Sequence, residues 1–278
     1  MVQIKTPEQI AKMREAGLVV AAIHAATREA AVPGATTRDL DEVARKVIAD
    51  HGAKSNFLGY GGFPATICTS VNEVVVHGIP DEKTVLKEGD IISIDAGAIV
   101  DGWHGDAAFT AFVGDGHAPE LLELSRVTEE SMWAGIAAMK NGNRLVDISR
   151  AVETYIRRQP RPAGGKYGII EEYGGHGIGT EMHMDPHLLN YVTRKRGKGP
   201  KLVPGFCLAI EPMVSLGTPH TEVLSDDWTV ITTDGTWSSH WEHSVALTEK
   251  GPLVLTAVDG GRAKLAELGV TAAPDPLA

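Results

Sequence analysis

Residues 91–113, IISIDAGAIVDGWHGDAAFTAFV, carry the clearest architectural signal in the chain. Two mainly apolar segments flank the dipeptide Asp101-Gly102, and Asp-Gly between such segments is a strong signal for a tight β-hairpin turn. The stretch therefore predicts two antiparallel strands that are joined by a two-residue loop.

Two acidic residues interrupt these strands. With a two-residue loop, Asp106 pairs opposite Gly97, and Gly97 shares a face with Asp95 because strand side chains alternate with period two. Both carboxylates then point the same way from a largely apolar sheet, where they repel each other unless a cation binds or one of them takes up a proton. A solvated hairpin edge is the alternative that the pair alone leaves open.

One pair of helical patterns precedes this hairpin, and a second pair follows it. A capping sequence at Thr6 predicts a helix over residues 7–31, and Thr37 can cap the helix after it. The later pair is expected over residues 119–140 and 147–158. The two pairs match at a constant offset of 108, at Gly34, Asp39, Leu40, Val47 and Ile48 and at Gly142, Asp147, Ile148, Tyr155 and Ile156.

An internal duplication is one explanation of this match, and chance recurrence of a common helix pair is the other. A duplication predicts one domain over residues 1–278, with two similar lobes at about 1–117 and 118–258 and a tail over 259–278. The last seven residues, 272–278, are rich in Ala and Pro and predict a frayed end. Strands are expected in the second lobe over residues 206–214, 228–232 and 241–248.

A glycine-rich segment, GGHGIG at residues 174–179, surrounds His176. Glycine permits close approach to the backbone, so we interpret the bare segment as room for a ligand or substrate at the imidazole. The segment lacks the Lys-Ser/Thr of a phosphate-binding loop, and a flexible turn with an incidental histidine is the remaining alternative. His183 follows seven residues later and, taken singly, is of a type that is more often structural than functional.

Two glutamates interrupt apolar strand-like segments in the second half of the chain. Glu211 lies in CLAIEPMV, residues 207–214, and Glu242 lies in WEHSVAL, residues 241–247. Glutamate is rarely buried without a partner, so each position favours a bound cation, with a solvent-facing edge strand as the alternative.

Joined together, the acidic residues and His176 form an oxygen-rich donor set with one imidazole. Such a set suits two divalent first-row metal ions that share carboxylates and activate a water molecule, which is hydrolase chemistry. The chain lacks the His-Glu-x-x-His helix of zincins and the Gly-x-Ser-x-Gly turn of serine hydrolases. The candidate metal ligands are Asp95, Asp106, His176, Glu211 and Glu242.

Composition and charge narrow the class of protein. The 278 residues are 43% hydrophobic and 22% charged, as in ordinary globular domains. With 26 basic and 36 acidic side chains the formal net charge is -10, which disfavours nucleic acid or an anionic membrane as the main partner. Neither a signal-like N-terminus nor an apolar run of about 20 residues is present, so we expect a cytoplasmic protein. Cys68 and Cys207 are too few for a disulfide framework and are expected to be buried free thiols.

Six short motifs follow one another along the chain: VHGIP at 76–80, IDAG at 94–97, HGD at 104–106, GHGIG at 175–179, EPM at 211–213 and WEH at 241–243. In this order they resemble the type I methionine aminopeptidases, over about residues 4–251. The resemblance implies an α/β (α+β) chain with the pita-bread fold, a single catalytic domain. In that fold two pseudo-symmetric lobes with curved antiparallel sheets, covered by helices, hold metals between them.

The resemblance also implies roles for the residues that match by position. Glu211 moves a proton from metal-bound water to the leaving amine, His183 hydrogen-bonds the developing oxyanion, and His77 contacts the substrate backbone. The cofactors are two divalent ions, Co, Mn, Fe or Zn, and the sequence does not choose among them. One ion is bound by Asp106, His176, Glu211 and Glu242, and the other by Asp95, Asp106 and Glu242.

A methionine pocket is implied by the same resemblance, and ordinary core packing is the alternative for its apolar side chains. The chain departs from the family pattern at Gly61 and Val76, where bacterial relatives often carry His and Cys, and at Met182, where an aromatic is common. These departures leave the pocket shape and the substrate preference open. The implied pocket residues are Phe57, Tyr60, Phe63, Cys68, Met182 and Trp228.

The implied activity is removal of the initiator methionine from nascent proteins whose second residue is small. The alternatives are an X-Pro aminopeptidase or dipeptidase of the same fold and a catalytically silent binding homologue. Only 30 residues separate Glu211 from Glu242, which leaves no room for the helical insertion of type II relatives. The implied partners are nascent polypeptide N-termini, with the ribosome as a further candidate, and we expect a monomer that binds neither nucleic acid nor membrane.

Overall fold

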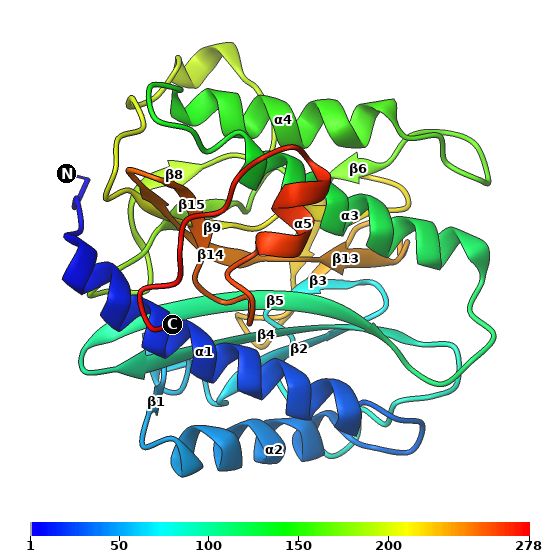
Figure 1. Ribbon diagram of the computed structural model, residues 1–278. Helices are drawn as coiled ribbons and strands as arrows, with labels where there is room; N and C mark the ends of the chain where they lie inside the picture. Colours follow the sequence, from blue (N-terminus) through cyan, green and yellow to red (C-terminus); the bar gives the residue numbers. More distant parts are fainter. Residues whose placement is uncertain (1) are drawn as a thin grey trace.

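The computed structural model describes residues 2–278 and places two helix pairs on opposite sides of a set of antiparallel sheets (Figure 1). Helices α1 (Pro7–Ala30) and α2 (Thr37–Asp50) cover one side. Helices α3 (Pro119–Ala137) and α4 (Leu145–Arg158) lie on the other side. The expected α/β architecture, antiparallel sheets covered by helices, is therefore confirmed.

Local capping explains where these helices begin. Thr6 and Gln9 form the expected reciprocal capping box at the start of α1. Helix α2 is capped by Thr36, whose backbone N–H donates to Asp39, so the prediction of Thr37 as the cap was wrong by one residue. Helices α2 and α4 each have 14 residues, and both their starts and their ends differ by 108 positions.

The predicted hairpin is confirmed in its register. Strands β4 (Ile91–Val100) and β5 (Trp103–Phe112) pair antiparallel around the two-residue turn, and Gly97 lies opposite Asp106. A four-stranded sheet forms when β1 (Lys54–Ser55) and β2 (Ile67–Val71) pair with β4. The apolar face of this sheet packs on α1 and α2, with Ile94 and Phe109 in the shared core.

Three further sheets complete the described structure. A five-stranded sheet has the order β15-β14-β9-β7-β8, and two three-stranded sheets have the orders β13-β10-β6 and β11-β12-β3. Their strands are β3 (Val74–Val76), β6 (Gly168–Ile169), β7 (Gly175–Gly177), β8 (Met184–Leu188), β9 (Cys207–Ile210), β10 (Met213–Ser215), β11 (Thr221–Val223), β12 (Val230–Thr232), β13 (Ser238–His240), β14 (His243–Thr248) and β15 (Gly251–Val254).

Two of the expected strands are interrupted. The segment expected as one strand over 206–214 is divided between β9 and β10, which belong to different sheets. Pro212 lies at the break, where its missing N–H cannot donate to a ladder. The segment expected over 241–248 begins only at His243, because Trp241 and Glu242 connect β13 to β14. Both breaks let the chain cross from one sheet to another.

The C-terminal residues are anchored, so the expectation of a frayed end was wrong. After the short helix α5 (Arg262–Glu267), the backbone N–H of Ala273 donates to the Pro252 carbonyl. The Asp275 carboxylate accepts hydrogen bonds from the Arg14 guanidinium at 3.0 and 2.7 Å. Arg14 is fully buried and needs a counter-charge, which outweighs the flexibility that an Ala/Pro composition favours.

Two expectations about the chain as a whole concern its cysteines and its helices. Cys68 and Cys207 are buried free thiols, as predicted. Of the helices described between residues 2 and 278, none combines the length and the apolarity that crossing a membrane requires.

Candidate metal centre and active site

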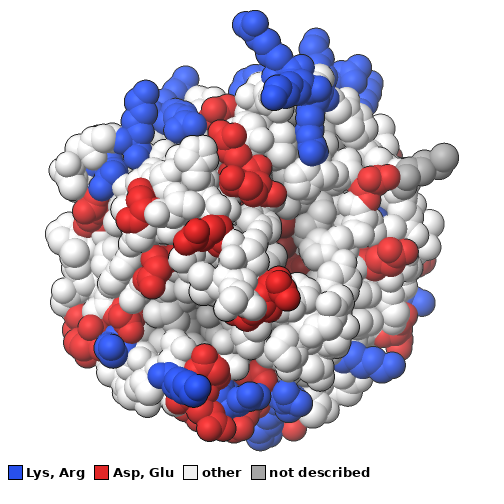
Figure 2. Space-filling model, turned by 180° about the vertical axis from the view of Figure 1, so that it is seen from behind, with Lys and Arg blue, Asp and Glu red and all other residues white. Residues whose placement is uncertain are grey.

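One cavity of about 270 Å³ brings the predicted site residues together. The face shown in Figure 2 is hollowed near its middle, and acidic atoms are visible inside the hollow. The cavity is lined by Phe57, Tyr60, Phe63, Cys68, His77, Asp95, Asp106, His176, Met182, His183, Glu211, Trp228 and Glu242. These are the thirteen residues that the sequence singled out for metal, catalytic and pocket roles.

The hairpin supplies the two aspartates from the sheet under α1. Asp106 is 3% exposed, and its backbone N–H donates to the Ser244 hydroxyl at 3.1 Å. Asp95 occupies the neighbouring strand, and each aspartate has one carboxylate oxygen, Oδ1, with no hydrogen-bond partner among residues 2–278. The predicted common face therefore exists and is turned into the cavity.

The glutamates come from the two strand breaks. Glu211 follows β9 and precedes β10, and Glu242 follows β13 and precedes β14. The two breaks lie side by side because Ile210 pairs with His243 in one sheet and Met213 pairs with His240 in the other. Neither glutamate lies on a solvent-facing edge, since Glu211 is 9% exposed and Glu242 is 2% exposed.

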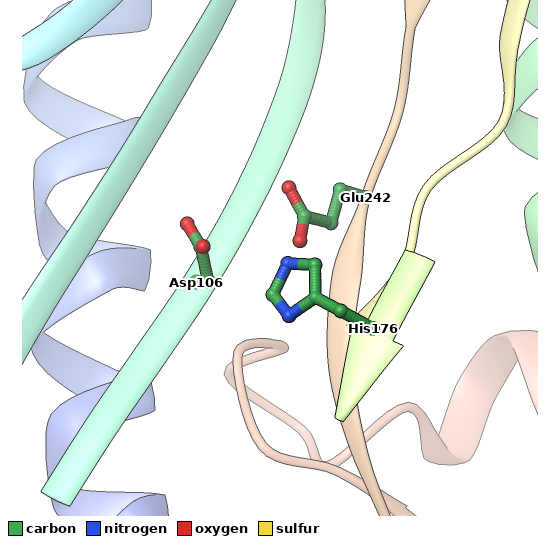
Figure 3. Close-up of side chains that lie close together, drawn as sticks. All are labelled: Asp106, His176 and Glu242. Atoms are coloured by element: carbon green, nitrogen blue, oxygen red, sulfur yellow. The ribbon is translucent and has the colours of Figure 1, made fainter. Parts of the chain in front are cut away.

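His176 reaches the carboxylates from β7, and Figure 3 shows Asp106, His176 and Glu242 turned toward one another from three separate strands or strand ends. Its Nδ1 lies 3.0 Å from the Gly177 carbonyl oxygen and its Nε2 lies 3.4 Å from Glu211 Oε1. A hydrogen bond from Nδ1–H to the carbonyl leaves Nε2 free to donate its lone pair to a cation.

The glycines around His176 have a different cause from the one we inferred. A Cβ at Gly175 would overlap the Ala209 carbonyl oxygen of β9, and a Cβ at Gly177 would overlap the Asp185 carbonyl oxygen of β8. The glycines therefore lack side chains because neighbouring strands pack closely against the backbone on both sides. Our interpretation of these glycines as space for a ligand was wrong.

Burial sets the charge state of the cluster. It raises the pKa of Asp95 to about 7, and it raises the pKa values of Asp106 and Glu242 well above their usual range, helped by the neighbouring acidic groups. Burial likewise raises the pKa of Glu211 and lowers the pKa of His176 to about 3. Crowded carboxylates and a neutral imidazole are the combination that a divalent cation would stabilise.

The donor atoms fit such cations in their spacing as well as in their chemistry. Asp106, His176 and Glu242 each offer an atom within 4.8 Å of the others, and so do Glu211, His240 and Glu242. Glu242 Oε1 has no hydrogen-bond partner in the described part of the chain, as is true of the Oδ1 atoms of both aspartates. Buried oxygens without partners are costly unless a cation occupies the space between them.

Two further histidines line the same cavity. His183 Nδ1 lies 2.8 Å from the Tyr60 hydroxyl, and the His183 ring lies 4.3 Å from the His176 ring between centroids. His77 has a positive φ of 59° and packs edge-on against the rings of Tyr173 and Trp228. Burial lowers the pKa of His77 to about 4 and also lowers that of His183, so both imidazoles are neutral near pH 7.

Aromatic and sulfur-containing side chains form the apolar wall. Phe57, Phe63, Cys68 and Met182 are buried in one cluster with Trp228 packed against it. Tyr60 is 44% exposed and belongs to the short 3₁₀ helix η1 (Tyr60–Gly62) at the rim of this wall. A Cβ at Gly61 would lie 3.2 Å from the Trp228 ring.

His240 is the residue of the cluster that our sequence reasoning missed. It lies at the end of β13 and is 1% exposed, and its Nε2 is 3.5 Å from Glu211 Oε2 and 3.9 Å from Glu242 Oε2. The signal that could have found it is its position two residues before Glu242, since residues two apart in extended chain face the same side.

The fold and the buried donor set are those of a metallopeptidase, and the chain belongs to metallopeptidase family M24, whose model matches residues 11–249. Among its relatives, methionine aminopeptidase 1 of Mycobacterium tuberculosis is 54% identical over 245 residues, which are 88% of this chain and 91% of the relative. Methionine aminopeptidase 1 of Bacillus subtilis is 45% identical, over 93% of this chain and the whole of the relative.

Solved structures agree with this assignment. Methionine aminopeptidase of Thermotoga maritima superposes with a TM-score of 0.87 at 41% identity, covering 92% of this chain and 99% of the other. An Xaa-Pro dipeptidase from Bacillus anthracis shares the fold, with a TM-score of 0.71 at 22% identity, covering 91% of this chain and 61% of the other. The resemblance to methionine aminopeptidases and the pita-bread fold, both expected from the motifs, are confirmed.

Proposed function

We propose that this chain is a metal-dependent aminopeptidase that removes N-terminal methionine from polypeptides with a small second residue. The observation that carries the proposal is the single cavity in which a carboxylate and imidazole cluster adjoins an apolar wall of aromatic and sulfur-containing side chains. Thioether and aromatic groups attract each other, so this wall suits a methionine side chain next to the reacting bond.

Family M24 is a metallopeptidase family, and we assign two divalent ions to the cluster. When bound, such ions supply Lewis acidity, which polarises a peptide carbonyl and makes a water molecule more acidic. Mn, Fe, Co and Zn all suit these donors. The proposed ligands are Asp106, His176, Glu211 and Glu242 for one ion, and Asp95, Asp106 and Glu242 for the other.

Glu211 is the residue that we assign to proton transfer. Its carboxylate is buried, and burial raises its pKa and allows it to hold a proton near neutral pH. It can take a proton from the attacking water and give it to the leaving amine. One carboxylate then serves both half-reactions.

His183 is assigned to the developing oxyanion, and Tyr60 sets its tautomer. If the Tyr60 hydroxyl donates to Nδ1 across 2.8 Å, the ring proton is on Nε2, which is then able to donate to the substrate. The ring is neutral because burial lowers its pKa. His77, held by its aromatic neighbours, is the proposed contact to the substrate backbone.

We further propose a monomer that acts in the cytoplasm on nascent polypeptide N-termini, with the ribosome as a site of encounter. Cleavage of a newly made chain requires a free N-terminus that can enter a narrow cavity, and the site described here opens to one face. Light scattering and co-sedimentation with ribosomes test the monomer and the encounter separately.

The experiment that tests the activity compares Met-Ala and Ala-Pro peptides with each of the four metals supplied in turn. We expect cleavage of Met-Ala and none of Ala-Pro. Preference for the proline peptide would identify an X-Pro peptidase, and a chain that binds no divalent ion and cleaves neither peptide would be a silent homologue.

A further inference from the structure

His240 is a buried imidazole of the metal cluster that the proposed ligand set leaves out. The cluster contains two groups of closely spaced donors that share Glu242. The first group includes His176, and the second includes His240 with Glu211. Each of the two donor groups therefore contains one buried imidazole.

The His240 side chain is buried and directed at acidic oxygens. Its Nε2 lies 3.5 Å from Glu211 Oε2 and 3.9 Å from Glu242 Oε2, and it has no hydrogen-bond partner among residues 2–278. These separations are too long for hydrogen bonds of ordinary strength, and an unpaired nitrogen that is 99% buried is costly. A cation placed between the three donors would use the nitrogen and both oxygens.

The backbone of His240 is held by the same hairpin that carries the aspartates. Its N–H donates to the Ser93 hydroxyl at 3.1 Å and to the Thr110 hydroxyl at 3.2 Å. Thr110 also donates to the His240 carbonyl oxygen at 3.1 Å. Ser93 shares a strand face with Asp95, so the polar face of the hairpin positions the aspartates and the histidine together.

We propose that His240 is a sixth protein ligand of the metal centre, donating Nε2 to an ion that is bound between Glu211 and Glu242. This inference rests on the proposed metal-dependent function and extends it. The added nitrogen shifts the site between Glu211 and Glu242 toward Co²⁺ and Zn²⁺ relative to Mn²⁺, which prefers oxygen donors.

The first test uses the wild-type chain loaded with Zn²⁺ and labelled with ¹⁵N-histidine. We expect two imidazoles per chain whose Nε2 resonances move to metal-coordinated shifts when Zn²⁺ is added. A single coordinated imidazole would overturn the assignment of His240 while leaving the proposed function intact. Zn²⁺ binding with no coordinated imidazole, or no binding, would instead contradict the proposed metal centre itself.

The second test titrates Co²⁺ into the metal-free His240→Gln variant and follows affinity by calorimetry and geometry by the visible absorption of Co²⁺. Loss of one nitrogen ligand should weaken one of the two binding steps by about 100-fold and change the absorption of that ion, while the other step stays the same. Equal affinities and equal spectra in variant and wild type would overturn the proposal.

The matched control is His243→Gln. His243 is a partly buried histidine three residues away, but its Nδ1 lies 2.8 Å from the Thr256 hydroxyl and its ring packs on Trp133, away from the cluster. This control should keep both Co²⁺ affinities within about twofold. Circular dichroism in chelator establishes that each variant folds, and if His240→Gln does not, the wild-type resonance count decides the question by itself.

Discussion

Glu211 must satisfy two demands with one carboxylate, because it is proposed both to bind an ion and to carry a proton. Its burial and its position between His176 and His240 make those demands compatible, since the imidazoles lie 3.4 and 3.5 Å from its two oxygens. The residue comes directly before Pro212, where the strand ladder stops, so the backbone is free to turn the side chain inward.

Replacing Glu211 by alanine tests this role. Glu211→Ala should lower kcat/KM for a Met-Ala peptide by about 10³-fold, because a positioned acid–base group contributes that order of rate. Glu222, an exposed glutamate on β11, is the control, and Glu222→Ala should leave kcat/KM within about twofold. Near-normal turnover in Glu211→Ala would remove this residue from the mechanism.

Tyr60 offers a second test at the scale of one atom. Tyr60→Phe removes the hydroxyl that faces His183 Nδ1, so the proton of that ring is no longer held on Nε2. We expect kcat to fall about tenfold with KM nearly unchanged, since about 1.4 kcal/mol of transition-state stabilisation corresponds to tenfold. Tyr191→Phe, which does not alter a residue lining the cavity, is the control. A rise in KM with constant kcat would show that Tyr60 binds substrate instead.

At the scale of the elements, close packing of α1 against the strands holds the site in place. Gly105 of β5 approaches Gly17 of α1 so closely that a Cβ on Gly105 would lie 2.9 Å from the Gly17 nitrogen. Gly17 in turn faces the Leu255 carbonyl beyond the end of β15. Asp106 follows Gly105 directly, so this contact between helix and hairpin fixes the position of Asp106, a proposed metal ligand, relative to α1.

A methyl group at this contact should therefore be costly. Gly17→Ala places a Cβ into the Leu255 carbonyl, and overpacking of this kind should lower the free energy of unfolding by about 3 kcal/mol. Ala25→Ser, on the exposed side of the same helix, should change it by no more than about 0.5 kcal/mol. Urea unfolding of both variants measures the difference, and equal stability would mean that the helix shifts to accept the methyl group.

The two helix pairs also bear on the origin of the fold. Helices α2 and α4 agree in length and in their offset of 108 positions, and Gly34 and Gly142 both have φ of 92° in the turns before them. We propose that residues 1–117 and 118–258 are related halves of one catalytic domain. Residues 259–278 follow them and include the segment that pairs with Arg14.

For the molecule as a whole, the proposed metal centre lies between these proposed halves. The aspartates come from the hairpin of the first half, and the histidine and both glutamates come from the second half. In the metal-free protein, burial raises the pKa of Asp95 to about 7, so folding favours the protonated carboxyl. That contribution to stability is full below the usual aspartate pKa of about 4 and is lost as pH rises through about 7.

The stabilisation of the folded chain by added metal should increase as the pH rises. At pH 5 the carboxyls hold protons that compete with a cation, and at pH 8, above the pKa of Asp95, this competition is weaker. Addition of Mn²⁺ to the metal-free chain should therefore raise Tm little at pH 5 and by several degrees at pH 8. Calorimetric scans with Mn²⁺ and with chelator measure this, and a rise in Tm that is independent of pH would contradict the site.

Features that depend only on neighbouring residues could be predicted from the amino-acid sequence. The Asp-Gly turn set the hairpin register, because a two-residue loop leaves one pairing, and the capping residues set the helix starts to within one or two positions. Residue chemistry also identified the five candidate metal ligands, and none of these inferences required knowing which distant segments meet. The other eight residues that line the cavity were supplied by the resemblance to methionine aminopeptidases.

Contacts between distant segments could not be predicted in this way and became visible in the folded chain. The inclusion of His240 in the metal cluster, the strand neighbours that demand glycine beside His176, and the Arg14 partner that anchors the C-terminal residues all depend on such contacts. Burial is the physical reason. An imidazole or a guanidinium must find partners once it leaves water, and the fold, not the local sequence, determines which groups are close enough to serve.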